Sequence, residues 1–255
     1  MLRSLKAIHG YAVLARDGEI GRVHDFYFHD DNWIIRYLVV DTGRWLPGRK
    51  VLITPGALGK PQWAGFNIPV ELTREQVENS PEIDTEQPVS RQQETALFNH
   101  FGWPFYWVEP APGVWPPYVS PAPMPVPAPH GEAEHHDPRL RSQREVTGYR
   151  IHASDGAFGH VEDFIADDTA WVIRYLVVHT GKWLPAKKVL LSPKWLPEIR
   201  YADREVTVSL PKDKILNCPE FFPGAAVNRE YEERLYDYYG RPVYWEDRPS
   251  PSQTK

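Results

Sequence analysis

Apolar and polar residues alternate along short runs of the chain, a pattern typical of β-strands. Residues 11–15 and 20–28 form two such runs, and the pair Asp17-Gly18 between them favours a tight hairpin turn. The run 33–40 is rich in β-branched and aromatic residues and is apolar on both faces. We therefore expect a mainly β fold in which this strand is covered on both sides, with a terminal helix or a sister domain as the cover.

The remaining pattern predicts two more strands and two short helices. Residues 49–54 and 66–72 alternate as strands do. Thr73 and Ser90 are each followed three residues later by Gln, the spacing of a capping box, so a helix should begin after each of them. The second helix should end at Gly102 and dock its aromatic side on the sheet, because so short a helix does not persist alone in water.

The same pattern occurs twice. Residues 33–55 return as 171–193, and each residue of the second copy lies 138 positions after its match. That register continues without a gap from Leu2, matched by Leu140, to Trp107, matched by Trp245. A repeat of this length predicts two domains of one fold.

The repeat sets the expected domain boundaries. We predict a first repeat with its terminal helix at 1–109, a Pro-rich linker at 110–138, a second repeat with its helix at 139–247, and a disordered tail at 248–255. The linker has Pro at nearly every second position in its first part, a composition that cannot form a core and favours an extended spacer. Each repeat carries its own strands and helices, so we expect each to fold alone.

Composition narrows the class of protein. A net charge of -5 argues against a surface built to hold nucleic acid, so nucleic acid is an unlikely partner, although a local basic patch is compatible with it. The single cysteine, Cys218, permits no intramolecular disulfide. No apolar run is long enough for a signal sequence or a membrane span. We expect a cytoplasmic protein without membrane insertion.

No pattern in the sequence predicts catalysis. Phosphate-binding loops, dinucleotide fingerprints, nucleophile elbows and zinc-binding helix motifs are absent from the sequence. Cys218 is matched by Ser80 in the first repeat, which does not suit a nucleophile. His130, His135 and His136 are metal-ligand types without the spacing of a zinc site, so we interpret them as linker residues. We predict that the protein is not an enzyme and holds no cofactor or metal.

Two loops combine a tryptophan with three cations each. Trp and Arg commonly anchor protein interfaces, so these loops are candidates for partner or anion binding. The alternative is that each Trp lies in the core beside solvated cations. The candidate residues are Arg44, Trp45, Arg49 and Lys50 in the first loop, and Lys182, Trp183, Lys187 and Lys188 in the second.

One arginine in each repeat interrupts the apolar strand. Arg36 and its match Arg174 lie among apolar residues, and a nearly buried arginine needs a partner. Asp25 and Asp163 are the expected carboxylate partners. We interpret these four residues as structural buried charges.

The order GY…V…DG…GxVxDF…D…WxIRYLVVxTGxWLPxxKVLxxP resembles the PRC-barrel family in both repeats, over residues 2–84 and 140–222. The family includes the cytoplasmic barrel of the photosynthetic reaction-centre H subunit and a barrel of the ribosome maturation protein RimM. The resemblance implies a small bent β-barrel that docks other macromolecules and has no common catalytic residues. This chain lacks the membrane helix of an H subunit and the extra N-terminal barrel of RimM.

These observations lead to a functional expectation. We expect an adaptor, or an assembly or regulatory module, with two PRC-type barrels and a protein partner. Barrel pairing within one chain, or a homo-oligomer, would bury residual apolar surface. The alternatives are an anion- or RNA-binding module that uses the basic Trp loops, and a soluble relative of the reaction-centre H subunit linked to photosynthetic electron transfer.

Overall fold

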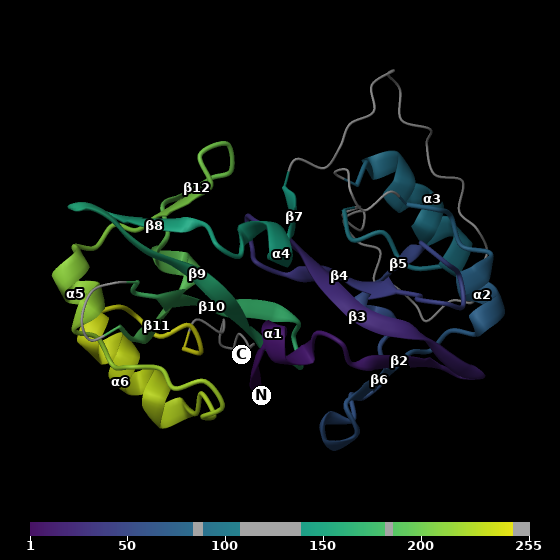
Figure 1. Cartoon of the computed structure of the whole chain (residues 1–255), viewed down its shortest axis with the longest axis horizontal. Helices are drawn as coiled ribbons and strands as arrows, with labels where there is room; N and C mark the ends of the chain where they lie inside the picture. Colours follow the sequence, from purple (N-terminus) through teal and green to yellow (C-terminus); the bar gives the residue numbers. More distant parts are fainter. Residues whose placement is uncertain (84–88, 108–138, 182–185, 247–255) are drawn as a thin grey trace, which may run out of the picture. The chain divides into compact units, whose positions relative to one another are not determined.

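The computed structural model describes residues 1–83, 89–107, 139–181 and 186–246. Within them the fold is mainly β, as predicted, with a few short helices (Figure 1). The strands are β1 (Leu2–Ser4), β2 (Ala12–Ala15), β3 (Gly18–His29), β4 (Ile35–Asp41), β5 (Lys50–Ile53), β6 (Asn67–Pro69), β7 (Leu140–Ser142), β8 (Arg150–Ala153), β9 (Gly156–Asp167), β10 (Val172–His179), β11 (Lys188–Leu191), β12 (Glu198–Arg200) and β13 (Glu205–Thr207). The α-helices are α1 (Leu5–Ile8), α2 (Arg74–Glu78), α3 (Arg91–Phe101), α4 (Gln143–Val146), α5 (Lys212–Leu216) and α6 (Arg229–Tyr239), and 3-10 turns cover Pro55–Ala57, Trp63–Gly65 and Pro193–Trp195.

The chain forms two compact units, each built around one sheet. Unit 2 is the continuous stretch Ile8–Ser142, and unit 1 combines Met1–Ala7 with Gln143–Lys255. The sheet of unit 2 has the order β5-β4-β3-β2-β6, with β7 paired to β3. The sheet of unit 1 has the order β11-β10-β9-β8-β13-β12, with β1 paired to β9. Both units therefore present equivalent strands in the same order around a long central strand, and unit 1 adds β12 beyond β13.

Each central strand approaches its neighbour closely at a glycine. Gly21 of β3 has φ +150°, and a Cβ built there would lie 2.1 Å from the carbonyl oxygen of Asp41 on β4. At Gly159 of β9 a Cβ would lie 2.3 Å from the carbonyl oxygen of His179 on β10. No side chain fits at either position, so each glycine is required by strand packing.

The helices begin and end where their caps predict. The hydroxyls of Thr73 and Ser90 accept the amides of Gln76 and Gln93, and both capping boxes are complete. Gly102 ends α3 in the left-handed conformation, with φ 69°. None of the described helices has both the length and the apolar character needed to cross a bilayer.

Two predicted strands are shorter than expected, and in both a left-handed residue sets where the strand begins. β4 begins at Ile35 rather than at residue 33 because Trp33 has φ 60°, a left-handed conformation that does not belong in a strand. β6 begins at Asn67 because Phe66 has φ 52°, and it ends at Pro69, before the expected end at residue 72. Alternation alone does not reveal such left-handed residues.

The most important difference from the sequence prediction concerns the strands β1 and β7. β1, from the first repeat, pairs with β9 of the second, and β7, from the second repeat, pairs with β3 of the first. The expected boundaries at 1–109 and 139–247 therefore differ from the observed units at their amino ends. The whole of the predicted linker at 110–138 and of the predicted tail at 248–255 lies outside the described residues.

The core of unit 2 includes the exchanged strand. Leu140 of β7 is 7% exposed and packs with buried residues of the sheet and of α3. The same cluster supports the closing aromatic residues of the first repeat. Its members are Tyr27, Tyr37, Val39, Leu52, Ile83, Val89, Leu97 and Phe98, with Phe101, Trp103, Phe105, Tyr106 and Trp107 packed against it.

Candidate functional site

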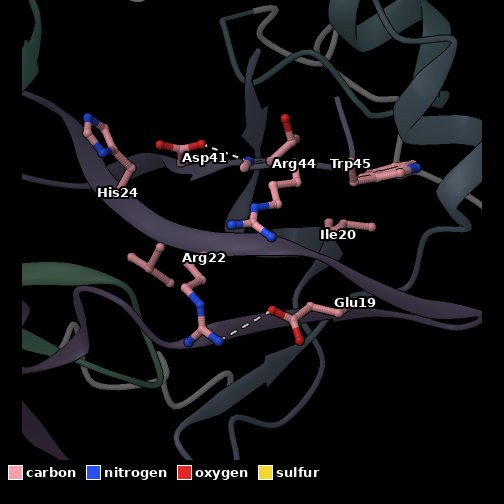
Figure 2. A pocket seen from close by; sticks show the side chains of 11 residues that line it. Glu19, Ile20, Arg22, His24, Asp41, Arg44 and Trp45 are labelled. Atoms are coloured by element: carbon pink, nitrogen blue, oxygen red, sulfur yellow. Dashed lines mark hydrogen bonds and ion pairs between the residues drawn. The ribbon is translucent and has the colours of Figure 1, made fainter. Parts of the chain in front are cut away.

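A cavity of about 580 Å³ in unit 2 lies beside the first basic Trp loop (Figure 2). Its wall is formed by the first half of β3, from Glu19 to His24, and by the end of β4 with the loop from Asp41 to Trp45. The two strand ends meet there because Gly21 permits their close contact. The sequence-predicted residues Arg44 and Trp45 therefore line a concave surface, which the sequence pattern alone did not indicate.

The polar groups on the β3 side of this cavity are already engaged. Arg22 donates to the carbonyl oxygen of Gly10 at 3.0 Å, and its guanidinium lies 3.7 Å from the carboxylate of Glu19. On the β4 side, the Asp41 carboxylate accepts the amide of Gly43 at 2.8 Å and fixes the start of the loop. Figure 2 shows the Arg22–Glu19 pair and the Asp41 contact as dashed lines.

Arg44 differs from these residues. Its side chain is exposed, and within the described part of the chain it has no hydrogen-bond or ion-pair partner. The loop that carries it is rigidly held, since the Thr42 hydroxyl lies 2.7 Å from the carbonyl oxygens of both Leu46 and Arg49. A fixed loop thus presents an unpaired cation at the edge of a cavity.

Trp45 is half-buried rather than part of the core. The guanidinium of Arg74 lies over its ring, 4.6 Å from the ring centre, which is a cation–π contact. Arg74 is itself fixed at the start of α2, where its amide donates to Asp17 at 2.8 Å. One part of the Trp45 ring is therefore supported by the fold and the rest is accessible.

The other described cations of the two loops act inside their own units. Arg49 donates to the carbonyl oxygens of Glu78 and Ser80, so it caps the end of α2. Lys187 donates to the carbonyl oxygen of Cys218 at 3.1 Å after α5, and Lys188 binds the Glu162 carboxylate at 2.7 Å. These contacts account for Arg49, Lys187 and Lys188 as structural residues.

The three remaining candidate residues of the two loops add no binding surface to that of Arg44 and Trp45 in the part of the chain that the structure describes. Lys50 is half-buried at the start of β5 and has interactions within the fold. Lys182 and Trp183 lie outside the described residues. The structure therefore brings Arg44 and Trp45 together on one cavity and assigns Arg49 to a helix end.

The predicted buried-charge residues have different partners from those expected. Asp25 accepts the hydroxyl of Ser142, and Asp163 accepts the hydroxyl of Ser4, both from exchanged strands. The guanidinium of Arg36 lies over the ring of Tyr106 at 4.1 Å. The expected pairing of Arg36 with Asp25 was based on charge alone and did not consider the closing aromatic motif.

Arg174 follows the same scheme in unit 1. Its guanidinium lies over the ring of Tyr244 at 4.4 Å and 3.9 Å from the Asp167 carboxylate. Burial raises the pKa of the Asp163 carboxyl above its ordinary value, against the hydrogen bonds from Ser4 and the Lys6 amide. The carboxylates thus serve strand attachment, and the arginines serve helix docking.

Sequence reasoning missed a buried cluster that occurs once in each unit. Glu94 of α3 is fully buried and accepts the hydroxyls of Tyr37 at 2.6 Å and Tyr106 at 2.7 Å. Its second oxygen pairs with Arg91 at 2.8 Å. Burial first, and then the charge of Glu94, raise the pKa of both phenols, so they stay protonated donors at neutral pH.

Unit 1 holds the same arrangement around Glu232. Tyr175 donates to it at 2.7 Å and Tyr244 at 2.9 Å, and Arg229 pairs with it at 3.1 Å. The sequence does place a glutamate four residues after each helix cap, Glu94 after Ser90 and Glu232 after Asn228. A glutamate at that position is equally expected on an exposed helix surface, so it did not indicate a buried cluster. This cluster ties sheet, helix and closing aromatics together, and its buried position suits stability rather than chemistry.

A thiol and a possible metal-ligand cluster could suggest catalysis or metal binding, but their neighbours indicate a structural role for both. Cys218 is buried, and burial raises the pKa of its thiol, so the thiolate nucleophile is disfavoured. His29, Asp30 and Asp31 lie close enough to share a cation. However, Arg141 of β7 lies 3.5 Å from Asp30, and Arg139, just before β7, pairs with Asp31, so both carboxylates already face cations.

Comparison with known proteins adds no assignment. The sequence matches no protein-family model, and no curated protein is significantly similar to it.

Proposed function

We propose that this chain is a non-catalytic, cytoplasmic adaptor of two PRC-type barrels that binds a protein partner through Arg44 and Trp45. The observation that carries the proposal is an exposed, unpaired Arg44 beside a half-buried Trp45 on a cavity of about 580 Å³. Arginine and tryptophan are the side chains most often found as interface anchors. A carboxylate on the partner suits Arg44, and an apolar or aromatic side chain suits the cavity and Trp45.

The PRC-type barrel is proposed on the sequence resemblance and on contacts between the two ends of the sheet order in unit 2. In unit 2 the segments that follow β5 and β6 come together, because Leu58 bridges Val70, and Gly59 donates to the Pro69 carbonyl oxygen at 2.8 Å. These contacts join the end of β6 to the segment that follows β5, and β5 and β6 are the two outer strands of the sheet order β5-β4-β3-β2-β6. They support closure of the sheet into a small barrel.

The alternative function is a binding module for a polyanion such as RNA. The unpaired Arg44 favours this function as well, because a cation suits a phosphate. The two functions differ in salt dependence. Affinity for a polyanion should fall steeply as salt rises, because counterions are released on binding, whereas an interface centred on Trp45 should lose little.

The experiment compares the full chain with Arg44→Glu and Trp45→Ala in capture of proteins from native lysate, followed by titration of the captured protein. Lys60→Glu is the matched control, since Lys60 is an exposed cation of the same unit. We expect affinity to fall at least about tenfold, or about 1.4 kcal/mol, for both test variants and to stay unchanged for Lys60→Glu. Unchanged binding by both test variants would refute the proposed site.

Trp45→Ala must remain folded for this comparison. Because Trp45 is half-buried, its loss should cost about 1–2 kcal/mol, below the 3–5 kcal/mol typical of a core tryptophan. Urea unfolding of the variant measures this cost and shows whether a lost interaction reflects binding or unfolding.

A further inference from the structure

The exchanged strands β1 and β7 occupy equivalent sites in the two units. In unit 1, Leu2, Arg3 and Ser4 face Asp167, Ala166 and Ile165 of β9. In unit 2, Leu140, Arg141 and Ser142 face His29, Phe28 and Tyr27 of β3. Every pair in one unit matches a pair in the other, 138 residues away. The two acceptor edges therefore have the same register.

The side-chain contacts of the two strands also match. Arg3 donates to Asp168 at 2.6 Å, and Arg141 lies 3.5 Å from Asp30, the equivalent carboxylate. Ser4 and Ser142 each donate to a buried aspartate, as described above. The backbone contact beyond each strand is equivalent too, since the amides of Asp168 and Asp30 donate to the carbonyl oxygens of Met1 and Arg139 at 2.9 Å.

Because both strands read Leu-Arg-Ser, neither edge distinguishes its own strand from an identical one supplied by another chain. The two units differ in how the chain supplies the strand. Unit 2 is one continuous stretch that contains β7, whereas unit 1 receives β1 from the segment Met1–Ala7, on the far side of unit 2 in the sequence. Releasing β1 therefore opens unit 1 and leaves every strand of unit 2 in place.

We propose that two copies of this chain assemble by exchanging Met1–Ala7, so that β1 of each copy pairs with β9 of the other. Each chain then gives one segment and receives one, which closes the assembly as a twofold dimer in which both β9 edges are occupied. The partner copy supplies Arg3 to Asp168 and Ser4 to Asp163, the same contacts that the single chain makes. A single chain gains from the proximity of its own segment, so the dimer should form when chains refold at high concentration.

The test uses two single-cysteine variants of the full chain, Arg3→Cys and Ala166→Cys, which place the cysteines at facing positions of β1 and β9. Both carry Cys218→Ser, a change that the matching Ser80 shows to be compatible with the fold. The variants are mixed, unfolded, refolded together at high concentration and oxidised. Neither variant can form the β1–β9 disulfide within one chain, so a covalent dimer specific to the mixture reports exchange between chains.

We expect covalent dimers in the mixture at no less than tenfold their level with either variant alone. Light scattering of the unmodified chain after refolding should also show a dimer fraction that rises with protein concentration. A mixture that gives no excess over the single variants, or an unmodified chain that stays monomeric throughout, would overturn the proposal. A dimer without the β1–β9 disulfide would equally overturn it, since another surface would then hold the copies together.

Discussion

Replacing Glu94 with alanine should destabilise unit 2 by about 3–5 kcal/mol, the usual cost of removing one partner from a buried charged network. The variant leaves Arg91 without its 2.8 Å partner and the hydroxyls of Tyr37 and Tyr106 without their acceptor. All three groups lie where helix, sheet and closing aromatics meet, so water cannot replace the carboxylate without loosening the packing. Chemical denaturation followed by tryptophan fluorescence measures the loss.

The repeat supplies a matched control for this prediction. Glu232→Ala should cost a similar amount in unit 1, because Tyr175, Tyr244 and Arg229 surround it in the same way. Tyr37→Phe removes one donor and leaves the Glu94–Arg91 pair, so it should cost only about 1–2 kcal/mol. A loss below about 1 kcal/mol for both glutamate variants would show that the cluster does not hold the helices to their sheets.

The second large effect concerns the strand β7. A fragment covering residues 8–142 contains all of unit 2 and should unfold cooperatively. A fragment of residues 8–138 lacks only β7 and its flanking arginine, and it should be less stable by roughly 3 kcal/mol or more. Burial of Leu140 contributes about 1.5–3 kcal/mol of this, and the hydrogen bond from Ser142 to buried Asp25 about 1.5–3 kcal/mol.

The fragment of residues 1–109 tests whether the folding unit follows the observed unit or the sequence repeat. It carries β1 but not β7, so β1 would have to bind the open edge of β3 within its own repeat. We expect it to be less stable than residues 8–142, because the path of the chain attaches β1 to β9 rather than to this edge. If residues 1–109 unfold as cooperatively and at the same denaturant concentration as residues 8–142, each repeat closes on its own strand and the observed exchange is not needed.

Much of the fold could be predicted because it depends on local sequence. The capping boxes at Thr73 and Ser90 and the terminating Gly102 act within one helical turn, and the structure confirms all three. The central strand of each unit follows from its dense run of apolar and aromatic residues. The left-handed residues Trp33 and Phe66 set the start of two strands, and no residue-type rule indicates such a conformation for an aromatic side chain.

The exchange of β1 and β7 could not be predicted, because the two strands have the same three residues. Either strand satisfies either edge, so the hydrophobic pattern favours neither arrangement. The choice between pairing within a repeat and exchange between repeats depends on the path of the chain after each strand, through α1 and α4. That path is set by tertiary structure and not by the residues of the strands. The partner of Arg36 was missed for a related reason, since Tyr106 is 70 residues away in the sequence and contacts it only after α3 docks.

The sequence identified the residues of the candidate site but could not distinguish them from structural residues. The sequence singled out Arg44 and Trp45 together with six further residues, and nothing in the pattern distinguished a free cation from one that caps a helix. Arg49 reaches the end of α2, whereas Arg44 points from a loop that the hydroxyl of Thr42 fixes. Only the positions of α2 and β3 separate these roles.

The most direct test of the exchanged strands is a pair of disulfide variants of the intact chain, both with Cys218→Ser. His29→Cys with Leu140→Cys places cysteines at facing positions of β3 and β7. His29→Cys with Leu2→Cys instead tests whether β3 pairs with the strand of its own repeat. We expect an intrachain disulfide in the first variant and none in the second, judged by mass and by thiol labelling of the monomer. A disulfide in the Leu2 variant, with free thiols in the Leu140 variant, would contradict the exchange.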